Sequence, residues 1–254
     1  MGREPLGDIV ETTAEAAEPR SEETVRRFSV NQRLQHLVVM VTFTVLALTG
    51  VPQRFSDFGA SQWMIENLGG IHAVRLIHRT SGIVFVIAAL YHLGFLFRHI
   101  ILQGRPMTMM VTVRDFLEAI QALRYDLGLS QRHPKFGRFD FRQKFEYWGM
   151  LFGGAVISLS GLILMYPTWA TKFLPGQLIP VAKTAHGYEG LMALAVIVIW
   201  HLYGAHFGPD RFPADTAIFT GKITRERMRK EHSLEYQELL DAETEAAASS
   251  ETDP

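Results

Sequence analysis

The sequence predicts an all-α integral membrane protein built as a bundle of four transmembrane helices. Its apolar segments are each about 20 residues long, which is the length that an α-helix needs to cross a bilayer. They occupy residues 34–51, 76–97, 147–167 and 186–207. None has the polar face that a helix of a soluble bundle presents to water. We therefore expect a membrane domain at residues 26–230.

The two ends of the chain differ from this domain in composition. Residues 1–25 are acidic and contain no aromatic side chain, so we expect a disordered N-terminal arm. Residues 231–254 begin with the end of a helix, and from Asp241 they become a second acidic segment that we also expect to be disordered.

Lysine and arginine give the orientation of the spans. Basic residues are concentrated in both terminal arms and in the link between the second and third spans, whereas the other two links hold only Arg54, Arg75, Lys172 and Lys183. By the positive-inside rule, both termini and the long link are cytoplasmic. We expect a multi-pass protein of the inner cell membrane, surrounded by membrane lipid.

The long link contains a helical pattern of its own. Val113, Phe116, Ile120 and Leu123 recur at the spacing of one helix face. This pattern predicts a cytoplasmic amphipathic helix that lies along the membrane surface or against the other helices.

The composition excludes several kinds of site. The chain has no cysteine, so it can form no disulfide, thiolate-bound iron–sulfur cluster or covalently attached haem. Any iron–sulfur centre would belong to another subunit. The formal net charge of −1 gives no sign of nucleic-acid binding.

The fourth segment presents two histidines at two depths. His201 follows His186 by fifteen residues, which places it about 60° around the helix and about 22 Å along the axis. Gly190, four residues after His186, removes a side chain beside the first imidazole. Ionisable groups inside a membrane helix generally mark a functional site.

The second segment repeats this arrangement. His78 is followed by Gly82 after four residues and by His92 after fourteen, a step of about 40° and about 21 Å. Two helices of this kind predict two haems, each bound by two imidazoles, with one haem near each membrane surface.

Topology limits which histidines can meet. The second and fourth spans both run inward, so His78 and His186 share the outer depth and can bind one haem. His201 lies at the inner depth, where His92 and His36 are alternative partners. His206 lies about 140° from His201 around the helix, so we do not expect the two to serve the same haem.

Two other classes of protein could contain these histidines. A polytopic transporter generally has interrupted helices at its substrate site, and none of the four segments is visibly broken. A haem-free membrane anchor would leave buried imidazoles without partners, which costs free energy.

The order of several short motifs resembles a known family. It is similar to the membrane cytochrome b subunits (gamma subunits) of respiratory formate dehydrogenases, and to the related b-type subunits of nickel–iron hydrogenases and similar redox complexes. The motifs are Arg33 and His36 at the start of the first span, Leu48-Thr49-Gly50 at its end, Arg75-Leu76-Ile77-His78 with Gly82 in the second, Gln143, Lys144 and Trp148 at the third, and His186 with Gly190 and a late histidine in the fourth.

The resemblance implies an electron-transfer subunit of an oxidoreductase complex. Such a subunit binds two b haems and relays electrons between a periplasmic or extracellular redox subunit, an iron–sulfur protein or a multihaem cytochrome, and the membrane quinone pool. The outer ligands would be His78 and His186, and the inner ligands His36 and His201. Quinone would react near the cytoplasmic face, where Asp140 and Gln143 are candidates for its pocket.

The chain departs from the family pattern at three points. Leu37 replaces the tryptophan that usually follows the first histidine, His92 has no counterpart in the formate dehydrogenase subunits, and the step from His186 to His201 is one residue longer. These departures leave room for a third haem held by His92 and a spare histidine such as His206.

Overall fold

Four long helices dominate the structure, a computed structural model that describes residues 23–132, 134–208 and 211–251. Each is long and apolar enough to cross a membrane, which confirms the predicted all-α class and its four spans. The spans are α1 (Val30–Arg54), α3 (Gly70–Phe97) with a π-helical extension to Leu102, α5 (Phe141–Met165), and α7 (Leu178–Ala195) with a π-helical continuation to Phe207. The expected disordered arm lies outside the described residues as far as residue 22.

Local sequence explains where the first spans begin and end. Ser29 and Gln32 form a capping box at the start of α1, in which Gln32 N donates to Ser29 Oγ at 3.3 Å and Ser29 N donates to Gln32 Oε1 at 2.9 Å. Pro52 falls in the last turn of α1, where it interrupts the helical hydrogen bonds. Gly69 and Gly70 adopt positive φ angles of 92° and 85° and turn the chain into α3.

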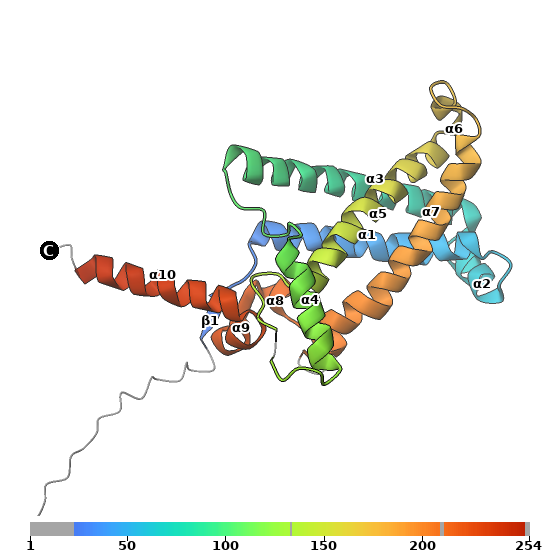
Figure 1. Ribbon diagram of the computed structural model, residues 1–254. Coiled ribbons are helices and arrows are strands. Elements are labelled where there is room, and N and C mark those ends of the chain that lie inside the picture. Colours follow the sequence, from blue (N-terminus) through green and yellow to red (C-terminus); the bar gives the residue numbers. More distant parts are fainter. Residues whose placement is uncertain (1–22, 133, 209–210, 252–254) are drawn as a thin grey trace, which may run out of the picture.

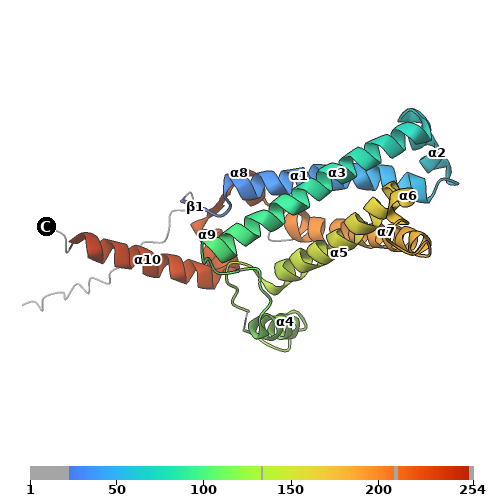
Figure 2. The ribbon, with the colours of Figure 1, turned by 90° about the horizontal axis from the view of Figure 1, so that it is seen from above.

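The spans form two antiparallel hairpins. α1 packs on α3, and α5 packs on α7. The hairpins cross one another in Figure 1, and the view from above shows them as two layers (Figure 2). Contacts of α1 with α7 and of α3 with α5 join the layers. The links α2 (Gly59–Asn67) and α6 (Pro167–Ala170) lie at one end of the bundle, and the remaining short elements lie toward the other (Figure 1).

The outer surface of the spans is apolar. In all four spans only a small share of the most apolar window is buried inside the protein. Large side chains such as Leu76, Ile87, Leu90 and Ile199 are 60–73% exposed. A surface of this kind is stable in lipid and would be costly in water.

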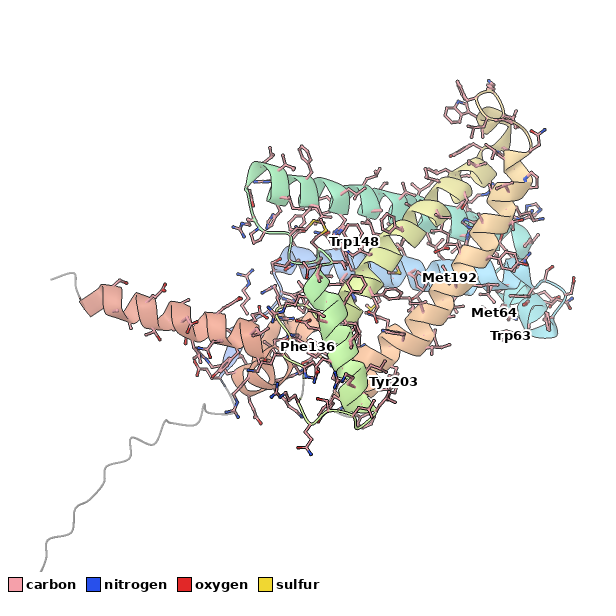
Figure 3. The ribbon with its side chains drawn as sticks, in the orientation of Figure 1. Trp63, Met64, Phe136, Trp148, Met192 and Tyr203 are labelled. Atoms are coloured by element: carbon pink, nitrogen blue, oxygen red, sulfur yellow. The ribbon has the colours of Figure 1, made fainter. Side chains whose placement is uncertain are left out.

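The long link forms the predicted amphipathic helix, α4 (Val113–Asp126). A buried ion pair, Lys144 Nζ to Asp115 Oδ1 at 2.7 Å, joins it to α5. Trp148 of α5 donates from Nε1 to Met109 O at 2.9 Å at the loop that leads into α4 (Figure 3). The apolar face predicted for this helix stays exposed, so it does not pack against the spans and fits a membrane surface instead.

A small ladder and two helices follow the last span. After α8 (Ala217–Thr220), β2 (Lys222–Thr224) pairs antiparallel with β1 (Thr24–Arg26), and α9 (Arg225–Glu231) leads into α10 (Ser233–Glu251). No residue pattern indicated the two three-residue strands. α10 is helical through most of the segment expected to be a disordered tail, because its Ala and Glu residues have high helix propensity.

Candidate functional site

The structure brings the two outer histidines together. His78 of α3 and His186 of α7 have ring centroids 6.2 Å apart and planes at 77°. Imidazole nitrogens bind transition metals at about 2 Å and a ring centroid lies about 1 Å behind the nitrogen, so two imidazoles on opposite sides of one metal ion hold their centroids about 6 Å apart. The separation of this pair therefore fits a shared metal.

Thr49 determines which nitrogen of His78 can bind a metal. The Thr49 hydroxyl donates its single hydrogen to Val45 O at 2.6 Å, and its oxygen lies 2.9 Å from His78 Nδ1. The oxygen must accept from this nitrogen, so Nδ1 carries the proton and Nε2 keeps the lone pair that a metal requires.

Ser160 does the same for His186. Its hydroxyl donates to Val156 O at 2.6 Å and lies 3.2 Å from His186 Nδ1. Ile157 O, which can only accept, is 3.0 Å from the same nitrogen. Both outer rings are thus held as Nδ1–H tautomers by neutral oxygens.

Glycines follow both hydroxyl residues and make room for the rings. A Cβ atom on Gly50 would lie 3.1 Å from His78 Cε1, and one on Gly161 would lie 3.0 Å from His186 Cε1. Gly82 and Gly190 would meet only ordinary contacts at 3.9 and 3.6 Å. Sequence reasoning missed the roles of Thr49 and Ser160, although Leu-Thr-Gly at 48–50 and Leu-Ser-Gly at 159–161 give the signal.

The inner pair joins the first and last spans. His36 of α1 and His201 have ring centroids 6.2 Å apart and planes at 36°. The segment Val196–His201 is π-helical, with hydrogen bonds that span five residues instead of four, so each of its turns holds more residues than a turn of α-helix. This widening can accommodate the longer step expected between His186 and His201. His201 Nδ1 lies 2.9 Å from Glu146 Oε2, so the inner ring has a carboxylate partner.

His92 has a different environment. Its Nδ1 lies 2.8 Å from Gln35 Oε1 and its Nε2 lies 3.1 Å from the Tyr147 hydroxyl, so both ring nitrogens have protein partners. His206 has a buried Nδ1 without a hydrogen-bond partner and lies beside Phe207. In the described part of the chain, neither ring forms a pair with another histidine.

Asp140 and Gln143 form the capping box of α5. Gln143 N donates to Asp140 Oδ1 at 2.8 Å, and Asp140 N donates to Gln143 Oε1 at 3.1 Å. Arg142 also contacts the buried Asp140 carboxylate at 3.2 Å. These contacts give both residues a structural role, and their contact with quinone stays a prediction.

The pairs suit only some metals. Among the described residues, no group of three or more His, Cys, Asp or Glu side chains could hold a metal ion. A bare ion needs more than two protein ligands. Haem would bring the other ligands of its iron with it, so it would need only the two imidazoles of each pair from the protein. The residues present fit haem in this respect.

Comparisons with known proteins agree with this chemistry. The chain matches the family model for prokaryotic cytochrome b561 over residues 27–219. It is 22% identical over 220 residues to the cytochrome b556(fdo) subunit of formate dehydrogenase from Escherichia coli, which covers 85% of this chain and 94% of that protein. It is 24% identical over 209 residues to the formate dehydrogenase cytochrome b556 subunit of Haemophilus influenzae, covering 81% and 79%.

A second Escherichia coli relative is the cytochrome b556(Fdn) subunit of the nitrate-inducible formate dehydrogenase, at 22% identity over 211 residues, covering 83% and 89%. The family model covers well over half of the chain, and its description as a cytochrome b implies haem b. The chain therefore belongs to the prokaryotic cytochrome b561 family, and it is a multi-pass membrane cytochrome b of electron transport whose cofactor is haem b.

Proposed function

We propose that this cytochrome binds two b haems and relays electrons across the membrane between an external redox subunit and quinone. The supporting observation is that two histidine pairs, each with a centroid separation of 6.2 Å, lie toward opposite ends of the same four spans. His78 and His186 hold the outer haem, and His36 and His201 hold the inner haem. The step from His186 to His201 separates the two sites by about 20 Å.

The haems supply the one-electron chemistry, and the protein binds and orients them. Hydrogen bonds at Nδ1 of His78, His186 and His201 fix the ring orientation and leave Nε2 for iron. Apolar spans exclude water around the sites. His92 has partners for both nitrogens, which favours His36 as the partner of His201 and two haems rather than three.

The sequence orients the relay. The end of the bundle that holds β1, α4 and α9 is the more basic one, so we place it in the cytoplasm together with both termini. Quinone then reacts near the inner pair, with Asp140 and Gln143 still candidates for its contacts. The outer pair lies toward the α2 and α6 end, where a partner subunit with iron–sulfur centres or several haems would dock. The relatives are named as subunits of formate dehydrogenases, which supports a redox partner subunit.

Reduction of the haems by quinol tests the relay. The full chain is placed in bilayer nanodiscs with a quinol, and haem reduction is followed by absorbance. We expect both haems of the unchanged protein to be reduced. In His36→Ala, the remaining outer haem should accept electrons from dithionite but not from quinol.

The matched control is His72→Ala, because His72 lies near the start of α3 and belongs to neither pair. It should behave like the unchanged protein. Quinol reduction of the outer haem in His36→Ala at the normal rate would contradict the proposed inner entry point.

A further inference from the structure

The two histidine pairs differ in the atoms that accept from Nδ1. The outer rings donate to neutral oxygens of Thr49, Ser160 and Ile157. His201 of the inner pair instead contacts the carboxylate of Glu146, with 2.9 Å between Nδ1 and Oε2.

Glu146 lies where a carboxylate has few other partners. It is in the second turn of α5, and its side chain and that of His201 are both partly buried. The neighbouring residue Phe145 lies against Trp200, with ring centroids 6.3 Å apart. Lys144, two residues before Glu146, forms its ion pair with Asp115 instead. Among the described residues, the Glu146 carboxylate has its hydrogen bond with His201.

A carboxylate partner changes the metal-binding nitrogen. An anion that accepts the Nδ1 proton draws it away from the ring and makes Nε2 a stronger electron donor. A stronger donor and a nearby negative charge both stabilise ferric over ferrous iron, and the charge acts strongly in a low-dielectric site. Neutral acceptors have these effects to a smaller extent.

We infer that Glu146 is a positioning residue that lowers the reduction potential of the inner haem through its hydrogen bond with His201. The inner haem is then a stronger reductant toward quinone than the same site would be with a neutral partner. This role rests on the proposed binding of haem by His201.

Redox titration of the haem-loaded chain tests the role. In Glu146→Gln the isosteric amide removes the charge, so the midpoint potential of the inner haem should move to a more positive value while that of the outer haem stays unchanged. Glu118→Gln is the matched control, because Glu118 pairs with Arg114 on α4 at 2.8 Å and contacts neither histidine pair in the structure. It should leave both potentials unchanged.

The outcomes separate this role from the proposed function. An unchanged inner potential in a Glu146→Gln protein that retains both haems would overturn the role of Glu146 and leave the relay intact. Absence of haem from the unchanged protein, or an inner haem that persists in His201→Ala, would overturn the proposed ligation itself.

A second variant covers the case in which Glu146→Gln loses the inner haem. The midpoint potential is then measured in Glu146→Asp, whose shorter side chain lengthens the contact with His201. A positive shift there supports the role, and no shift contradicts it.

Discussion

Thr49 and Ser160 each place one hydroxyl group between a backbone carbonyl and an imidazole. Both side chains are buried, at 3% and 6% exposure, inside spans where water cannot replace a lost contact. The carbonyl four residues earlier takes the hydroxyl hydrogen, so the oxygen is left to accept from Nδ1. A residue that is common at helix interfaces in membranes thereby also sets a histidine tautomer.

Removing one of these hydroxyls should weaken haem binding at the outer site. We expect Thr49→Val to lower the affinity of the outer site about 10-fold, the usual effect of losing the hydrogen-bond partner of a metal-binding histidine. Transfer of haem to an apo-haem protein measures the change. Thr44→Val is the control, because the Thr44 hydroxyl donates to Met40 O at 2.8 Å without contacting a histidine. Equal losses in both variants would contradict the role.

Gly161 should be sensitive to the smallest added side chain. In Gly161→Ala the new Cβ atom would lie 3.0 Å from His186 Cε1, so the ring has to move. Such overpacking costs about 1–3 kcal/mol. We expect partial loss of the outer haem, measured by the haem content of the purified chain. Gly149→Ala on the same helix adds a Cβ atom that has no neighbour within 4 Å. If Gly161→Ala retains as much haem as this control, the close contact has no consequence.

At the scale of elements, two buried polar contacts position the parts outside the spans. One holds α4 against α5 through Asp115 and Lys144. Burial raises the pKa of Asp115, but hydrogen bonds from Lys144 and Thr112 more than offset this and lower it below its ordinary value.

The second buried polar contact joins the two ends of the chain. Buried Arg27 pairs with Glu235. In the same cluster, His232 Nδ1 lies 2.9 Å from Gly137 O.

Loss of the Lys144 charge should release α4. Lys144→Met leaves a buried carboxylate unpaired, and breaking a buried pair on one side costs about 3 kcal/mol. We expect faster hydrogen exchange in α4 while the haem content is unchanged. The double variant Asp115→Asn/Lys144→Met removes the unpaired charge, so it should recover part of the protection. Equal exchange in the unchanged protein and Lys144→Met would show that the pair does not anchor α4.

The cluster at His232 should weaken in acid. Burial lowers the pKa of His232, and the neighbouring Arg27 lowers it further, whereas Gly137 O, Glu235 and Glu231 act in the opposite direction. Because the unfolded segment takes up a proton near the ordinary value of 6.5 and the folded one does so only at lower pH, the stabilisation is complete above pH 6.5 and declines as the pH falls toward the folded value.

Hydrogen exchange of α9 and α10 measures this decline. After correction for intrinsic rates, protection should be lower at about pH 5.5 than at about pH 7.5. His232→Gln, which cannot take up a proton, should remove the difference. A difference that persists in this variant would assign the pH dependence to another group.

At the scale of the whole molecule, the spans and the depth of each histidine follow from the sequence. Apolar length gave the four helices, and the direction of each span predicted which histidines share a membrane depth. The partners of their Nδ1 atoms could not be predicted, because Thr49 and His78, or Ser160 and His186, meet only when separate helices pack.

The choice between His36 and His92 also depended on packing. The π-helical segment Val196–His201 changes the direction in which the His201 side chain points, compared with a regular α-helix, and no residue pattern marks this change. The β1–β2 ladder was missed because three-residue strands are too short to show an alternating pattern.

Haem content in single-histidine variants tests the account most directly. Pyridine haemochrome quantification of the purified chain should give two b haems, and His36→Ala should contain one fewer. His92→Ala should still contain both, because the ring nitrogens of His92 contact Gln35 and Tyr147 and not a haem. Loss of a haem in His92→Ala with full content in His36→Ala would contradict the inner pair, and absence of haem from the unchanged chain would contradict the relay.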